Sequence, residues 1–112
     1  MHDIGAEQGP ILRLFEVHAK PGQAAILLEK FATTSAAVVA DQPGNAGYFF
    51  GQGMLGAEDR VIFASLWSSL EAIQQRFGAQ WQDSFLPPGY EDLIAQCSIR
   101  HIDLSGGWHP AL

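Results

Sequence analysis

The chain has 112 residues, a length typical of a single domain. Its formal net charge of -6 disfavours nucleic-acid and anionic membrane partners, because phosphate groups would repel it. A single cysteine, Cys97, excludes a disulfide within the chain. No apolar run approaches the roughly 20 residues that cross a bilayer, and the N-terminal sequence lacks a signal-peptide pattern. We therefore expect a cytoplasmic protein with no nucleic-acid or membrane partner.

The composition also indicates a partner of another kind. Hydrophobic residues make up 47% of the chain and charged residues only 16%, against a usual charged share of about 25%. So few charges leave little surface that favours water, which suggests that some apolar surface is covered. The simplest cover is a second copy of the chain, so we expect a homodimer.

The first half of the chain predicts a strand, a helix and a second strand. Residues 11–19 are apolar at odd and even positions, which is typical of a strand buried on both faces. Lys20-Pro21-Gly22 predicts a turn. Residues 23–40 predict a helix, since one stripe at three- and four-residue spacing holds Ala24, Leu27, Leu28, Phe31, Ser35 and Val38. After Pro43-Gly44, residues 46–54 predict an aromatic strand whose glycines suggest a bulge or a closely approaching ligand.

The second half predicts a strand, a helix and a final strand. Residues 60–67 form the third strand, which ends at Trp67. Ser68 and Glu71 have the spacing of a capping box, so a helix is expected to begin there and to continue to about Phe77. In a second helical piece beyond Gly78, Trp81 and Phe85 would share the face of Phe77, and residues 95–103 then form the last strand.

The element order β-α-β-β-α-β predicts an α+β, ferredoxin-like domain with a four-stranded antiparallel sheet and two helices on one face. We expect the domain to span residues 11–104, between a flexible arm at residues 1–10 and a tail at residues 105–112 whose Trp108 lies on a surface or on a dimer mate. The first and last strands, which carry His18 and His101, are expected not to be adjacent.

Several of these segments together carry a family resemblance. Residues 11–19 run into Lys20-Pro21-Gly22, a helix ends before Pro43-Gly44, and Leu66-Trp67-Ser68-Ser69-Leu70-Glu71 precedes Phe77-Gly78. This pattern resembles the antibiotic biosynthesis monooxygenase-like family of dimeric α+β barrels over residues 11–104. The resemblance implies homodimers with sheets packed face to face, and a pocket in each subunit between sheet and helices. Such families include cofactor-independent oxygenases of aromatic polyketides, quinol oxygenases, haem-degrading enzymes and isomerases, so the fold does not select the reaction.

Two subfamily patterns can be compared with this sequence. The haem-degrading members share an Asn on the first strand and a Trp and a His on the second helix. In this sequence the equivalent strand position is near Phe15, and residues 70–86 hold no His. Polyketide oxygenases share a strand-end tryptophan, which Trp67 matches. Two positions that are polar in those oxygenases are apolar here, at Phe63 and Ile73.

The resemblance implies oxygenation of an aromatic or quinol-like small molecule, and we expect no organic cofactor and no metal. Such a reaction needs a dry pocket, an oriented ring and a proton acceptor or donor. The candidates for proton transfer are His18, Tyr48 and His101. The candidates for binding the ring or its anion are Trp67, Phe63, Phe77, Trp81 and Arg13.

Each candidate has a structural alternative. Trp67 is as well explained as a core residue, and both histidines as surface or dimer-edge residues, although Glu16 could orient His18. Arg13 and Arg100 could form ion pairs with Glu16 or Asp103. The whole chain could likewise be a non-enzymatic binder of small apolar molecules, an isomerase, or a structural dimer with a filled core.

Overall fold

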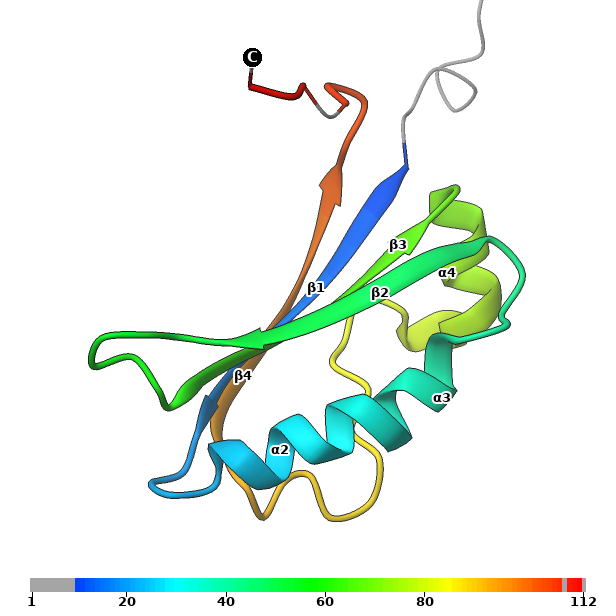
Figure 1. Ribbon diagram of the computed structural model, residues 1–112. Coiled ribbons are helices and arrows are strands. Elements are labelled where there is room, and N and C mark those ends of the chain that lie inside the picture. The colour runs from blue at the N-terminus through cyan, green and yellow to red at the C-terminus, as the bar shows by residue number, and fades with distance from the viewer. Residues whose placement is uncertain (1–9, 108, 112) are drawn as a thin grey trace, which may run out of the picture.

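The computed structural model describes residues 10–107 and 109–111. Both the arm expected at residues 1–10, apart from Pro10, and Trp108 therefore lie outside the described residues. Four strands form one antiparallel sheet in the order β2-β3-β1-β4 (Figure 1). The elements in chain order are β1 (Ile11–Ala19), α2 (Ala24–Lys30), η1 (Phe31–Ser35), α3 (Ala36–Val39), β2 (Asn45–Gln52), β3 (Arg60–Trp67), α4 (Leu70–Phe77), η2 (Gly78–Gln80) and β4 (Ile94–Asp103). The predicted α+β, ferredoxin-like fold is confirmed.

Strand β1 lies in the interior of the sheet, between β3 and β4. This position explains why the first strand is apolar at odd and even positions. The expectation that the first and last strands are not adjacent was wrong, because β1 and β4 pair along nearly their whole length. His18 nevertheless lies opposite Gln96 and His101 opposite Arg13, so the two histidines do not meet.

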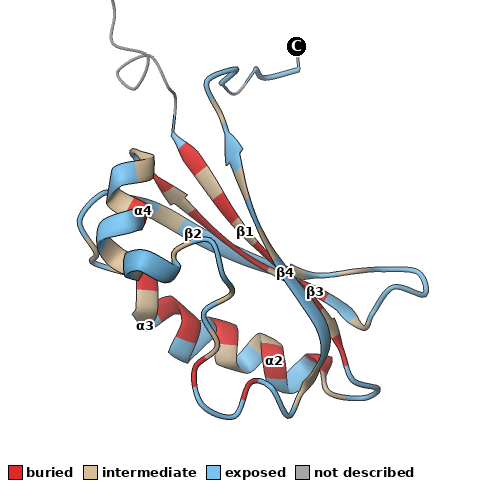
Figure 2. Ribbon diagram, turned by 180° about the vertical axis from the view of Figure 1, so that it is seen from behind, coloured by how far each residue is buried: buried red, intermediate tan, exposed pale blue. Residues whose placement is uncertain are grey.

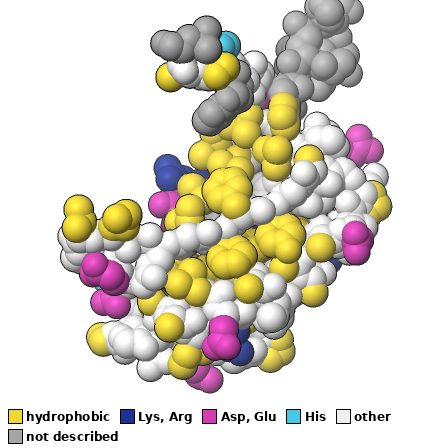
Figure 3. Space-filling view, viewed as in Figure 1, with side chains coloured by type: hydrophobic (Ala, Val, Ile, Leu, Met, Phe, Trp, Pro, Cys, Tyr) yellow, Lys and Arg dark blue, Asp and Glu magenta, His cyan; other side chains and the backbone are white. Residues whose placement is uncertain are grey.

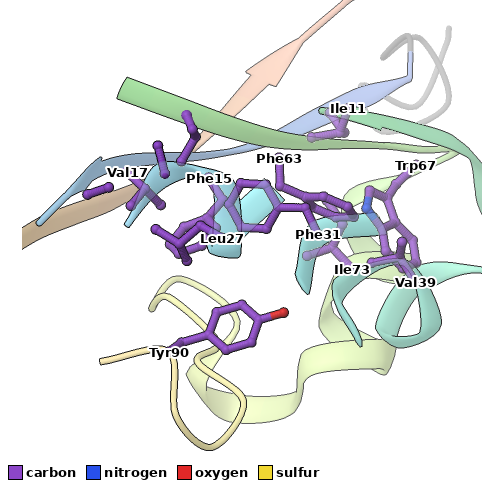
Figure 4. Packing of buried hydrophobic residues seen from close by; sticks show 13 residues of the cluster. Ile11, Phe15, Val17, Leu27, Phe31, Val39, Phe63, Trp67, Ile73 and Tyr90 are labelled. Atoms are coloured by element: carbon purple, nitrogen blue, oxygen red, sulfur yellow. The ribbon is translucent and has the colours of Figure 1, made fainter. Parts of the chain in front are cut away.

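The helices cover one face of the sheet, as the view from behind in Figure 2 shows. The odd-numbered residues of β1 are buried on this face, whereas the even-numbered ones are only partly buried. Figure 4 shows Phe15, Phe63, Phe31 and Trp67 packed beneath the strands, with Tyr90 reaching toward them from the segment before β4. The main core therefore lies between the sheet and the helices.

The first helical region is not the continuous helix predicted over residues 23–40. A five-residue π-helical turn, η1, separates α2 from α3. A π turn accommodates one extra residue, which rotates the following residues relative to the preceding ones. Val39 is consequently buried, while Val38 from the predicted stripe is only partly buried.

The second helix begins one residue later than the capping box predicted. Ser69, rather than Ser68, is the N-cap, and its Oγ accepts a hydrogen bond from the backbone N–H of Ala72 at 3.1 Å. The helix ends at Gly78, whose φ of 72° favours glycine. Beyond η2 the expected second helical piece is absent, since residues 81–93 contain only turns and extended chain. We refer to residues 81–89 as the cover segment.

The opposite face of the sheet carries no helix. Sheet register places on it the apolar residues Leu12, Leu14, Phe49, Ile62, Leu66 and Ile102. Figure 3 shows hydrophobic side chains gathered over the strands. Phe49 is 54% exposed, so this open face is apolar surface in contact with solvent. In the part of the chain that the structure describes, no helix is long and apolar enough to cross a bilayer.

Candidate functional site

A small cavity lies between the helix-covered face of the sheet and the cover segment. Its volume is about 40 Å³. The sheet lines it with Arg13, Phe15 and Phe63, α4 contributes Phe77, and the cover segment contributes Phe85 and Pro87. The walls are mostly apolar, with four phenylalanines among them, and Arg13 is the charged group. The position matches the pocket between sheet and helices that the sequence led us to expect.

Arg13 is a buried cation, 4% exposed. Its Nη1 donates to the backbone carbonyl of Trp81 at 2.5 Å and Nη2 donates to that of Asp83 at 3.1 Å. The guanidinium carbon lies 3.9 Å from the centre of the Phe77 ring, a cation–π arrangement. Among the described residues, Arg13 forms no ion pair with a carboxylate.

Burial without a counter-ion affects the protonation equilibrium of Arg13. Desolvation disfavours the charged form and lowers the pKa of Arg13 to about 10. The guanidinium therefore remains protonated near neutral pH. A positive charge in an apolar pocket, held only by neutral acceptors, is a favourable environment for an anionic group of a ligand.

His101 completes the polar part of the site. Its Nε2 lies 2.9 Å from Nη1 of Arg13, and since an arginine can only donate, Nε2 is the acceptor. The imidazole is thus neutral, with its proton on Nδ1. Burial, and then the charge of Arg13, lower the pKa of His101 below its usual value of 6.5. The Trp81 ring packs edge-on against His101, with ring centres 5.0 Å apart.

Phe63 is the centre of an aromatic cluster beside the cavity. Tyr48 stacks on Phe63 with ring centres 5.7 Å apart, and Phe50 stacks at 6.4 Å. Phe31 packs against Phe63 from the helical side at 5.6 Å. Tyr48 itself is 41% exposed on the edge strand β2. Tyr48 therefore contacts Phe63, which lines the cavity, and does not line the cavity itself.

Trp67 lies in the core rather than at the cavity wall. It is fully buried, and its indole N–H donates to Ser65 Oγ at 2.8 Å. Its ring meets Phe77 edge-on, with ring centres 5.8 Å apart. Phe77 thus faces the cavity while Trp67 supports it from behind.

His18 lies on the open face of the sheet, away from the cavity. Among the described residues, Glu16 on the same face makes no ion pair with His18, and its carboxylate pairs with Arg100 at 2.7 Å. The ion pair considered from the sequence thus forms for Arg100 and not for Arg13. The structure brings Arg13, His101 and Trp81 into one contact group and leaves His18 apart from it.

The sequence did not single out Tyr90, and it placed Phe85 only on the face of a helix that the structure does not form. Tyr90 is 1% exposed, and its hydroxyl contacts Ser35 Oγ at 2.7 Å and donates to the carbonyl of Lys30 at 3.1 Å. This anchors the end of the cover segment to the first helical region. The available signal was Ser35, a polar residue within the apolar helical stripe, which needed a buried partner.

Over residues 10–107 and 109–111, no three His, Cys, Asp or Glu side chains are arranged to hold a metal ion.

Comparisons with known proteins agree with this architecture. Residues 10–83 match the family described as antibiotic biosynthesis monooxygenase. A Pseudomonas aeruginosa protein superposes with a TM-score of 0.65 at 19% identity, covering 87% of this chain and 95% of its own. SnoaB, a cofactor-independent oxygenase from Streptomyces nogalater, superposes with a TM-score of 0.60 at 13% identity, covering 83% and 90%.

A third similar solved structure is that of a protein with a different activity. A haem-degrading protein from Mycobacterium tuberculosis has a TM-score of 0.60 at 22% identity and covers 85% of this chain and 90% of its own. At these identities the solved structures establish the fold alone. No curated protein sequence matches the chain.

Proposed function

Because the chain belongs to the antibiotic biosynthesis monooxygenase family, we propose that it is a cofactor-independent monooxygenase of an aromatic or quinol-like small molecule. The observation that carries the proposal is a buried, protonated Arg13 in a cavity walled by Phe63, Phe77 and Phe85. Aromatic walls hold a planar ring and exclude water. The guanidinium favours the ring once it has lost a proton.

The reaction follows from these two properties. A phenol, quinol or anthrone loses a proton, and the resulting anion passes an electron to dioxygen. The two radicals combine at carbon, and the peroxide loses water to leave a carbonyl group. For a ring CH₂ the balance is CH₂ plus O₂ giving C=O plus H₂O. Arg13 stabilises the anion that starts this sequence.

The proton must pass to a base near the cavity. His101 is our first candidate: its Nε2 accepts from Arg13 in the free protein, and it can take up the proton once the ligand anion occupies that guanidinium. Tyr48, stacked on Phe63, is the second. Trp81 positions His101 through its ring, and Trp67 positions Phe77 from the core. His18, on the other face, takes no part in this proposal.

The experiment is oxygen uptake with the tricyclic anthrone dithranol and with a panel of naphthoquinols, measured above the protein-free rate. Loss of a donor to a developing anion costs about 100-fold in rate, so Arg13→Gln should reduce kcat strongly. Arg100→Gln, which removes an arginine from the open face, is the matched control and should leave kcat unchanged. Uptake indistinguishable from the protein-free rate across the panel would contradict the proposal.

A second candidate is a non-enzymatic protein that binds the same class of molecule. Phe63 and Ile73 favour it, since they are apolar at two positions that are polar in the polyketide oxygenases. A thermal-shift screen separates the two functions, because a binder gains stability with aromatic ligands while no oxygen is consumed.

We further propose that the active form is a homodimer. The support is the apolar open face, where Phe49 is 54% and Ile102 36% exposed on a sheet without covering helices. Exposed apolar surface of this kind marks an association site. A second copy, placed by a two-fold axis, would cover it sheet to sheet.

A further inference from the structure

Arg13 binds the cover segment directly. Two of its N–H groups bind backbone carbonyls of one irregular segment, those of Trp81 and Asp83. Both acceptors are neutral and belong to the cover segment. Arg13 therefore both lines the cavity and fastens the segment that closes it.

The cavity is too small for an aromatic ring as it stands. An apolar cavity that accepts benzene measures about 150 Å³. The volume here is about 40 Å³, enough only for water-sized occupants. Because protein interiors are close-packed, a ring can bind only if one wall moves.

The middle of the cover segment is the wall best able to move. Phe85, which lines the cavity, is 50% exposed. Within the described residues, the backbone N–H groups of Ser84, Phe85 and Leu86 make no backbone hydrogen bond. The far end is fixed by Tyr90 on Ser35. The near end is fixed by Arg13, so the two bonds from Arg13 act as a latch.

An anion is the ligand group that would release this latch. A guanidinium and a carboxylate form two parallel, charge-assisted hydrogen bonds, whose energy and geometric fit two separate carbonyls do not match. Burying an ion pair is usually opposed by desolvation of both ions. Here Arg13 is already desolvated in the free protein, so only the ligand loses hydration. The stacking of Phe77 on Arg13 keeps the guanidinium in place for the exchange.

We propose that the pocket binds aromatic anions, with a carboxylate or phenolate on the ring, and that this group replaces the carbonyls of Trp81 and Asp83 on Arg13. The cover segment then opens around Phe85 and the ring takes the space beside Phe63. The inference rests on the proposed function only in using the same pocket, and it requires no turnover.

Binding of two matched probes tests the anion. Calorimetry on the full chain compares 2-naphthoate with the neutral 2-naphthamide, and we expect the naphthoate to bind about tenfold or more tightly. Arg13→Gln should abolish this preference by weakening the naphthoate alone. Arg13→Lys, which keeps the charge but loses the two-pronged geometry, should retain part of it. Arg100→Gln should behave as wild type.

Hydrogen exchange tests the latch. In the free wild type, the amides of Trp81 and Asp83, which donate to the carbonyls of Gly78 and Gln80, should exchange slowly, and 2-naphthoate should accelerate them. In Arg13→Gln they should exchange fast without any ligand, while Arg100→Gln should match the wild type. Equal exchange in wild type and Arg13→Gln would overturn the latch.

The outcomes separate this inference from the oxygenase proposal. Equal affinity of the wild type for the two probes, or a preference that survives Arg13→Gln, overturns the anion site whatever the oxygen uptake. A naphthoate preference that depends on Arg13 supports the site even where no anthrone is oxidised. If Arg13→Gln fails to fold by circular dichroism, the affinity ratio and the ligand-dependent exchange of the wild type still decide.

Discussion

Arg13 and His101 form a hydrogen-bonded pair, and the arginine determines which protonation state the histidine adopts. The arginine can only donate, so the histidine must accept and stay neutral. The histidine in turn is a polar partner for a cation that has no carboxylate among the described residues. A protonated His101 would place two positive charges together in a partly buried site, which is unfavourable.

The pKa of His101 should respond to Arg13. Burial is the larger cause of its lowering and the charge of Arg13 the second. We therefore expect the pKa to lie below 6.5 in the wild type, and to rise in Arg13→Gln while staying below 6.5. Titration of the imidazole resonances by NMR measures both values. An unchanged pKa in the variant would contradict the contact.

The same shift affects stability in acid. A folded state with a lowered histidine pKa binds fewer protons than the unfolded chain. The free energy of unfolding should thus fall as the pH drops from 6.5 through the folded pKa, and His101→Gln should reduce this part of the slope. Urea unfolding at several pH values measures it, with His18→Gln as the control.

Tyr90 and Ser35 should contribute as a unit to stability. Tyr90→Phe removes the hydroxyl that contacts Ser35 Oγ and donates to the carbonyl of Lys30, which costs about 1–2 kcal/mol. Ser35→Ala should cost a similar amount, and the double variant little more than either alone. Urea unfolding of the three variants checks this. Additive losses would show that the hydroxyls act independently.

At the scale of elements, periodicity predicted which segments are helical but not their internal irregularities. Ala24, Leu27 and Phe31 of the predicted stripe are buried as expected, because they lie before the π turn or at its first residue. After the turn, burial moves from Val38 to Val39, and no local sequence signal marks the extra residue. The cap at Ser69 rather than Ser68 is a similar case, since two adjacent serines offer equivalent hydroxyls.

Gly44 fixes the junction between the first helical region and the sheet. Its φ is 84°, and a Cβ there would lie 2.5 Å from the Cβ of Ala72. Its carbonyl accepts the backbone N–H of Ser68 at 2.7 Å, which ties the junction to the start of α4. Side chains are disfavoured at such a position by conformation and by contact.

Gly44→Ala should lower the free energy of unfolding by about 2–4 kcal/mol, from backbone strain plus overpacking. Gly22 is the matched control, with a φ of 79° but nothing within 4 Å of the added Cβ. Gly22→Ala should cost about 1–2 kcal/mol, from strain alone. Chemical unfolding of both variants compares them, and equal losses would contradict the role of Ala72.

The whole molecule is a sheet with one face covered by helices and one open face, and the element order predicted the helices on one face. Residues 11–19 were predicted to be buried on both faces, and the structure buries their odd-numbered side chains while the even-numbered ones are only partly buried. The sequence could not place Arg13, because parity along a strand does not say which face the helices cover. The sequence likewise did not predict that Phe85 lines the cavity, because Phe85 belongs to an irregular segment without periodicity.

The open face should mediate self-association. Wild type should scatter light as a particle of about twice the chain mass of 12.2 kDa at micromolar concentration. Phe49→Lys places a charge on the open face and should give monomers. Ile26→Lys, on α2 and 43% exposed, is the control and should remain dimeric. A monomeric wild type would contradict the dimer.

The most direct test of the account is a crystal structure of the protein grown with 2-naphthoate. We predict the naphthalene ring against Phe63 and Phe77, the carboxylate on Arg13, and the cover segment displaced around Phe85. A ring bound on the open face near His18, with Arg13 still donating to Trp81 and Asp83, would contradict the central claim that this pocket is the functional site.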